Sequence, residues 1–294
     1  MKPCSATAFF LLLASSAALG AMPVPSLRAS ATLSWAGNIS RTSDPSAERD
    51  ATTLDATATA TLNRQLTRDW FVWASAEASN FTDFDFGLTN RAQLGARAGL
   101  RRKFGLGPQA PTLDLNAGFS RRLARYGGSA GWVADAGARL SRRFGESFRA
   151  GLTGEWQQVY ARHSTFDTNH RQAGFDAAWD FAASWQLSAG AGRLWGDLVA
   201  NAAEPTYHAA LDGAAGPAVQ AYFATIAYEV NQLYGRDWVS YRVHARGDSA
   251  WLALSWAFND STSLTARVWG IRVINVVDIR YDTEIWSLTF AHRF

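Results

Sequence analysis

Long stretches of strict alternation between apolar and polar residues constrain the fold of this chain most. In "DATATATLNRQ" (55–65), the residues from Asp55 to Asn63 alternate between one set of Asp, Thr and Asn and one set of Ala and Leu. The stretch "RAQLGARAGLRRKF" (91–104) alternates in the same way. Successive side chains of a β-strand point to opposite faces, whereas helical spacing would mix the two sets on shared faces. Both stretches therefore predict β-strands.

The same pattern along the chain predicts an all-β fold, an antiparallel transmembrane β-barrel of about fourteen strands. We expect strands at 27–40, 51–63, 69–80, 90–104, 112–122, 131–144, 148–161, 170–181, 184–197, 217–230, 237–246, 249–258, 263–275 and 283–294. Short links such as "GESF", "AASW" and "NDST" alternate with longer polar ones, which is typical of a barrel with both termini in the periplasm. If residues 198–248 instead form one large external loop or an inward-folded plug, the barrel has twelve strands.

Aromatic residues stand at the ends of the predicted strands. One group ends strands on the side of the short links, and comprises Phe104, Phe144, Phe181, Phe258 and Phe294. Tryptophans begin strands at both ends: Trp70, Trp185 and Trp238 begin strands that start on the side of the short links, and Trp132 and Trp251 begin strands that start on the opposite side. Membrane barrels place such rings at their two water–lipid interfaces. We therefore expect two aromatic girdles.

The last strand carries the clearest family resemblance. Its alternate residues Trp286, Leu288, Phe290, His292 and Phe294 share one face. This ending resembles the C-terminal strand of Gram-negative outer-membrane β-barrel proteins, although His292 stands where an apolar residue is usual. The resemblance implies that Trp286, Leu288, Phe290 and Phe294 are read by the barrel assembly machinery.

The N-terminal segment predicts export. Lys2 precedes an apolar stretch that ends at the small residues Ala18 and Gly20. These features are typical of a cleaved signal peptide at 1–20, followed by a single outer-membrane barrel domain at 21–294. The only cysteine is Cys4, so the mature chain has no thiolate for a disulfide or a metal. We predict no cofactor, no metal site and no nucleic-acid partner, and the oligomeric state stays open.

Charged residues alternate onto the face that would line the lumen. The predicted lumen residues are Arg97, Arg101, Asp114, Asp135, Arg139, Arg149, Glu155, Asp176 and Arg242. In a functional interpretation, the arginines attract anions and the carboxylates shape the opposite wall of a pore. In a structural interpretation, neighbouring strands simply pair, for example Arg97 with Asp114 or Arg139 with Glu155. The 198–216 segment could block such a pore.

The sequence shows little sign of catalysis. None of the five histidines is followed two residues later by Ser, the spacing of the outer-membrane lipid hydrolases. A protease site built from Asp167 with His163 or His170 is a weak constellation, because loop residues of this kind are usually only solvated. We therefore predict that the protein is not an enzyme.

These observations favour a passive channel for small hydrophilic or anionic solutes in the outer membrane of a Gram-negative bacterium. Outer-membrane lipid, the barrel assembly machinery and a small solute are the expected partners. One alternative is a non-enzymatic export or assembly barrel for protein or polysaccharide. Its size and strand number resemble the barrel part of surface lipoprotein assembly modifiers, without the helical-repeat domain of that family. Another alternative is a plugged structural or adhesive barrel.

Overall fold

The computed structural model describes residues 25–294 and consists mainly of one antiparallel sheet of 13 strands. The strands are β1 (Ser26–Ala36), β2 (Ala51–Gln65), β3 (Trp70–Asp83), β4 (Arg91–Lys103), β5 (Thr112–Ala124), β6 (Gly131–Phe144), β7 (Phe148–Ala161), β8 (Thr168–Ala182), β9 (Trp185–Ala203), β10 (Tyr228–Asn231), β11 (Trp238–Ala257), β12 (Thr262–Asn275) and β13 (Arg280–Arg293). The helices are η1 (Pro45–Ala47), η2 (Gly87–Thr89), η3 (Gly127–Ser129), η4 (Ser164–Phe166), α2 (Glu204–Leu211) and α3 (Pro217–Phe223).

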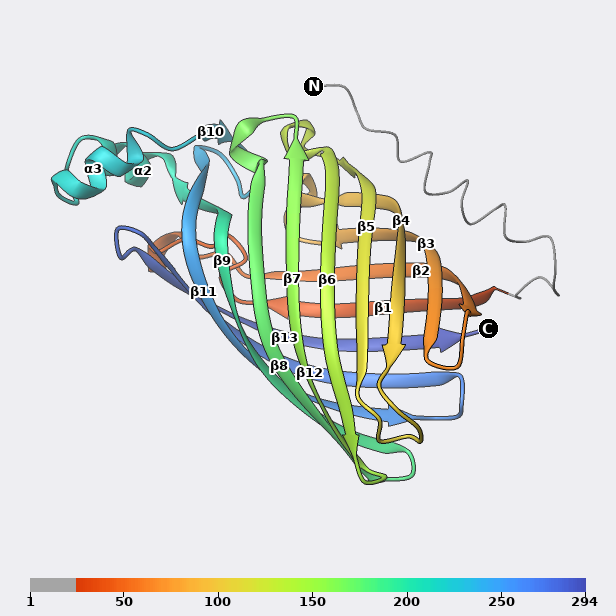
Figure 1. Ribbon diagram of the computed structural model, residues 1–294. Coiled ribbons are helices and arrows are strands. Elements are labelled where there is room, and N and C mark those ends of the chain that lie inside the picture. Colours follow the sequence, from red (N-terminus) through yellow and green to blue (C-terminus); the bar gives the residue numbers. More distant parts are fainter. Residues whose placement is uncertain (1–24) are drawn as a thin grey trace.

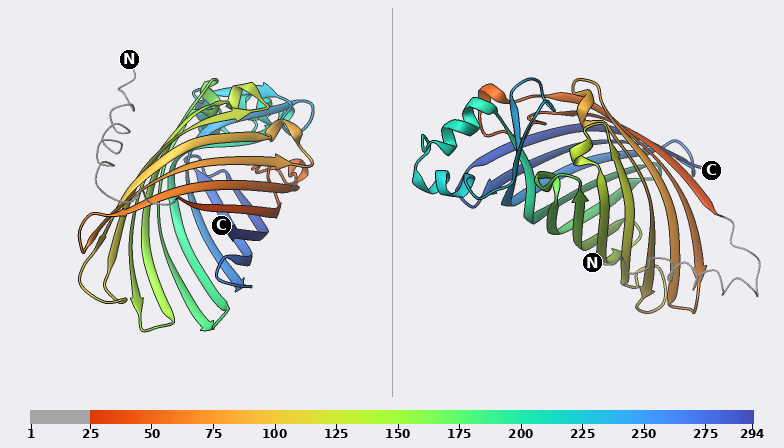
Figure 2. Two further views of the ribbon diagram at one scale, coloured as in Figure 1. Left: turned by 90° about the vertical axis from the view of Figure 1, so that its right-hand side faces the viewer. Right: turned by 90° about the horizontal axis from the view of Figure 1, so that it is seen from above.

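All strands except β10 close into a barrel (Figure 1). Each of them pairs with the next along the chain, except that β9 pairs with β11 because β10 lies outside the ring. The first and last strands complete the ring, since Arg28 pairs with Arg293 and Trp35 with Trp286. Figure 2 shows the red first strand beside the blue last strand. Twelve strands thus form a closed wall, as in the twelve-strand alternative that the sequence allowed.

The prediction of fourteen strands is wrong in one region. The stretches 237–246 and 249–258 are a single strand, β11, which keeps its register through Gly247 with both neighbouring strands. The polar residues Arg246 and Asp248 around this glycine resemble a turn in sequence, but they lie on the outer face of a continuous strand. The predicted strand 217–230 is instead the helix α3 followed by the short strand β10. Pro217 stands at the first position of α3, where its missing N–H costs nothing.

The two ends of the barrel differ in their connections. The start of β1 and the end of β13 lie at one end, together with the links 66–69, 104–111, 145–147, 183–184 and 258–261. We call this end the turn end. The opposite end, the loop end, carries the two longest connections, 37–50 and 204–237. The helices α2 and α3 project from the loop end in Figure 1.

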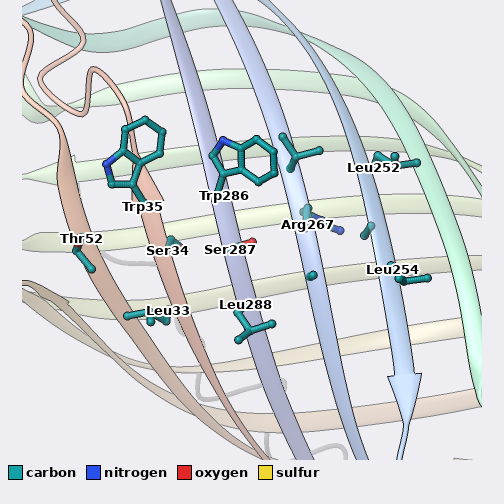
Figure 3. Close-up of a pocket in the computed structure, with 13 residues that line it drawn as sticks. Leu33, Ser34, Trp35, Thr52, Leu252, Leu254, Arg267, Trp286, Ser287 and Leu288 are labelled. Atoms are coloured by element: carbon teal, nitrogen blue, oxygen red, sulfur yellow. The ribbon is translucent and has the colours of Figure 1, made fainter.

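The outer face of the wall is apolar. Residues that pair across strands share a face, and Leu33 pairs with both Leu54 and Leu288. Figure 3 shows part of this face, a shallow groove of about 470 Å³. Exposed large apolar side chains continue around the barrel, for example Leu94 at 65% and Leu152 at 60% exposure. So large an exposed apolar surface requires a lipid surrounding rather than water.

The inner face of the same strands is polar. Thr32, between Ala31 and Leu33, pairs with Asp55 and Thr289 across the neighbouring strands. The hydroxyls of Thr32 and Thr289 form a hydrogen bond of 2.9 Å. The alternation in sequence thus separates a lipid-facing surface from a water-facing lumen.

The turn-end girdle is present. The five phenylalanines that were predicted to end strands lie at or next to strand ends there, and each is at least 43% exposed. The guanidinium of Arg102 stacks on Trp70 and Phe104 at 5.0 and 4.8 Å. A long arginine side chain at this position can pack its methylene groups against the aromatic rings while its charged group stays at the water–lipid interface. Two tryptophans depart from the prediction. Trp251 lies within β11 and points to the inner face, and Trp238 begins β11 at the loop end and is only 4% exposed.

The chain end is part of the wall. The N–H of Phe294 donates to the carbonyl of Leu27 at 3.0 Å, and the His292 ring packs on Phe294. His292 Nδ1 lies 2.9 Å from the hydroxyl of Thr262, which explains how a polar residue is accommodated on the outer face. Recognition of this strand by the assembly machinery stays a prediction.

The predicted signal peptide at 1–20 lies outside the described residues. In the described part of the chain, we find no helix long and apolar enough to span a membrane.

Candidate functional site

The lumen gathers eight of the nine predicted site residues. In one row across β4, β5 and β6, Arg101 stands opposite Asp114, and Asp114 stands opposite Arg139. In a second row, Arg97 and Asp135 lie on either side of Gly118. The remaining three, on β7 and β8, continue this inner face and are Arg149, Glu155 and Asp176. Charge of both signs therefore lines the inner wall along the five neighbouring strands β4 to β8.

Arg242 is not in the lumen. It alternates with Tyr241 and Val243, which share the inner face with Trp251, so its side chain lies on the outer side of β11. Its guanidinium donates to the carbonyl oxygen of Asp167 at 3.0 Å. The prediction was wrong because it placed a turn between two strands, whereas the alternation runs unbroken through β11.

The lumen charges form ion pairs, but with partners other than those expected. Arg97 pairs with Asp135 at 2.8 Å, and Arg139 pairs with Asp176 at 2.6 Å. Each of these pairs skips the strand in between. Two further pairs are Arg101 with Asp114 at 2.5 Å and Arg143 with Asp180 at 3.1 Å.

Glycines allow the pairs to skip a strand. A Cβ atom on Gly118 would lie 2.7 Å from Asp135 Oδ1 and 3.1 Å from Arg97 Nε. A Cβ atom on Gly151 would lie 2.9 Å from Arg139 Nη2. The side chains thus cross over the bare backbone of the intervening strand. Inward-facing glycines between opposite charges are the signal that would have predicted these partners.

Two tryptophans lie flat against the lumen wall. A Cβ atom on Gly99 would clash with the Trp73 ring, and one on Gly190 would lie 2.8 Å from the Trp251 ring. Because each indole covers a glycine of the neighbouring strand, neither ring projects far into the lumen. This packing leaves room for solvent.

A cavity of about 520 Å³ opens inside the lumen. Its walls come from β6 to β9, β11 and β12, and the lining residues are Arg139, Arg149, Asp176, Ala178, Gln186, Ser188, Trp251, Ala253, Ser255, Thr265 and Arg267. Three of these carry a positive charge and one carries a negative charge. The cavity is therefore a cationic, water-accessible part of the lumen. Arg267 and Trp251 were not among the predicted lumen residues.

At the loop end, residues 228–237 form a segment that we call the strap. The Tyr234 hydroxyl donates to the carbonyl of Ile39 at 3.1 Å, and the Tyr234 ring packs edge-on against Phe86. The Glu229 carboxylate lies 3.2 Å from His163 Nδ1. Burial raises the pKa of the Tyr234 hydroxyl, as expected for a ring enclosed by these loops.

The strap meets loops from opposite sides of the barrel. Ile39 belongs to the loop after β1 and His163 to the loop after β7, and these strands are six positions apart in either direction around the twelve. The strap and these loops therefore meet over the opening at the loop end. The segment 198–216, which the sequence suggested as a block, contains the end of β9 and the helix α2 at the loop end. Its Tyr207 packs on Tyr241.

The residues of the weak protease constellation have structural contacts. His163 Nδ1 lies 3.1 Å from the Thr165 hydroxyl, and Asp167 Oδ1 accepts a hydrogen bond from the Ala161 N–H at 2.5 Å. His170 lies on β8 and alternates onto the inner face. Among residues 25–294, no group of three or more His, Cys, Asp or Glu side chains could hold a metal ion.

Comparison with solved structures agrees with the outer-membrane β-barrel fold. The COG4313 outer membrane channel from Pseudomonas putida F1 aligns with a TM-score of 0.59 and 13% identity, over 95% of this chain and 98% of that chain. The NanC porin aligns with a TM-score of 0.44 and 8% identity, over 90% and 98%. At these identities the likeness concerns the fold alone. No protein-family model matches the sequence, and no curated protein matches it either.

Proposed function

We propose that this protein is an outer-membrane channel for small hydrophilic solutes that prefers anions. The observation that carries the proposal is the cationic cavity in a polar lumen, enclosed by a wall whose outside is apolar. Eight-stranded barrels have room only for side chains, and sixteen to eighteen strands leave a wide channel. A barrel of twelve strands whose indoles lie flat has room for a narrow aqueous path.

The charge arrangement supports a preference for anions. Arg139 is neutralised by Asp176, whereas within residues 25–294 Arg149 forms no ion pair and donates to the amide oxygen of Gln186, at 3.1 Å. Arg267 stacks on the Trp251 ring, with 4.3 Å between the guanidinium carbon and the ring centroid. Guanidinium groups without a carboxylate partner attract anions and repel cations in the low-dielectric surroundings of a narrow lumen.

We place the protein in the outer membrane of a Gram-negative bacterium, after removal of the predicted signal peptide. The apolar belt and the fold support the membrane location. Under this proposal the lumen passes solutes without chemical conversion.

The strap favours a second candidate, a plugged structural or adhesive barrel. It meets the surrounding loops over the opening, and an immobile strap would leave no continuous path. For the export alternative, the predicted strand number of fourteen was one of two features that resembled surface lipoprotein assembly modifiers, and the barrel has twelve strands.

The proposal predicts the sign of the ion selectivity. In a planar bilayer under a KCl gradient, the refolded chain should give a reversal potential of the same sign as the equilibrium potential of chloride. Arg149→Gln removes one free guanidinium and should shift this potential toward zero. The matched control is Arg142→Gln, because Arg142 lies on the outer face and stacks on Phe144. Inserted barrels that stay silent, or that prefer cations, would contradict the proposal.

A further inference from the structure

We propose that the lumen cavity is a binding site for a small carboxylate that carries hydroxyl groups. This inference deepens the channel function and rests on it, since it names the solute class for which the lumen is built. The cavity volume of about 520 Å³ lies within the roughly 300–1,000 Å³ typical of small-molecule sites.

Two guanidinium groups enter the cavity without a counter-charge. Arg149 comes from β7 and Arg267 from β12, and neither forms an ion pair within residues 25–294. Arg139 is already occupied by Asp176 at 2.6 Å. The planar fork of a guanidinium matches a carboxylate through two parallel hydrogen bonds. The cavity therefore offers two groups of the kind that bind carboxylates.

Arg267 is held in place before any ligand arrives. Its guanidinium carbon lies 4.3 Å from the centroid of the Trp251 ring, which in turn lies against the bare backbone of Gly190. The backbone of Gly190 and the guanidinium of Arg267 thus both pack on this indole. Stacking leaves the N–H donors at the edge of the guanidinium free to reach a ligand. A guanidinium that is already held in position loses little side-chain conformational entropy when a ligand binds.

The rest of the wall is suited to hydroxyl groups. Ser255 and Thr265 share a hydrogen bond of 2.9 Å, and each hydroxyl can also accept or donate toward the cavity. Ser188 from β9 adds a third hydroxyl. Apart from Trp251, the apolar lining consists of Ala178 and Ala253. This lining fits a hydroxylated carboxylate better than an aromatic one, which would need more apolar surface.

Calorimetric titration of the refolded full chain in detergent, with gluconate as the probe, tests this site. Gluconate should bind, while sorbitol lacks the carboxylate and acetate lacks the hydroxyl groups, so both should bind more weakly. Arg267→Gln should weaken gluconate binding by about tenfold or more, because it removes charge-assisted hydrogen bonds to the carboxylate. Arg267→Lys keeps the charge but loses the two parallel N–H donors of the guanidinium. Its affinity for gluconate should therefore lie between that of the unaltered chain and that of Arg267→Gln. Arg142→Gln on the outer face should bind like the unaltered chain.

The outcomes separate this inference from the channel function. Gluconate binding that is no tighter than acetate binding, or that Arg267→Gln leaves unchanged in a folded barrel, would overturn the site. Conductance in the same preparation would then leave the channel proposal standing. A barrel that binds gluconate but conducts no ions would retain the site and overturn the channel. If Arg267→Gln fails to fold, Arg149→Gln is expected to weaken gluconate binding through the other free guanidinium, and unchanged binding would again overturn the site.

Discussion

Ala58→Arg is expected to lower the free energy of unfolding of the barrel in lipid by about 2–4 kcal/mol. Ala58 lies on the outer face of β2, paired with Ala29 and Ala78 in the middle of the apolar belt. A guanidinium at this depth would lose its hydration without gaining a partner. Urea titration of the refolded protein in lipid vesicles, followed by tryptophan fluorescence, measures the change.

Thr59→Arg is the matched control for this prediction. Thr59 is the next residue of the same strand, lies on the inner face, and pairs with Glu77 on β3. An arginine there remains in water, opposite the Glu77 carboxylate on one side and the Arg28 guanidinium on the other. Because attraction and repulsion between exposed charges are both small, the free energy of unfolding should change by less than about 1 kcal/mol. Equal losses from the two variants would mean that the two faces of β2 are not lipid and lumen.

Replacing residues 229–237 by a short Gly-Ser linker is expected to raise the single-channel conductance severalfold. This change removes Tyr234, which bonds to Ile39, and Glu229, which contacts His163. Because current through a pore is limited by its narrowest section, opening the loop end should matter more than any change in the wider lumen.

The control for the strap is a replacement in the same long connection. Residues 212–216 join α2 to α3, and replacing them by a linker of equal length should leave the conductance unchanged. Recordings in planar bilayers compare the three proteins. If the strap variant inserts and conducts no better than the unaltered chain, the strap does not limit the current.

The sequence predicted the class of fold because the wall of a membrane barrel is simple in pattern. Each strand alternates between lipid and water, and β2 shows this alternation over residues 55–63 without exception. The division of β11 into two predicted strands arose where this alternation between apolar and polar faces fails. Arg246 and Asp248 surround Gly247 on a part of β11 whose outer face is polar, so a continuous strand there resembles two strands and a turn.

The candidate site was predicted in its residues more than in its contacts. The faces of Arg97, Arg139 and Asp176 follow from the alternation alone. Their ion pairs depend on which strands are two apart and on the missing side chains of Gly118 and Gly151. The strap could not be predicted, because its contacts join loops that are distant in sequence and close only in the finished ring.

Thiol modification inside the lumen tests the central claim most directly. Ser188→Cys places a thiol in the cavity, and Ala189→Cys places one on the outer face beside Leu252, both in a Cys4→Ser background. A negatively charged, membrane-impermeant thiol reagent should modify position 188 and reduce the anion current of that variant, and should leave the current of the Ala189→Cys variant unchanged. A current that stays constant while mass spectrometry shows position 188 modified would mean that ions do not pass through this lumen.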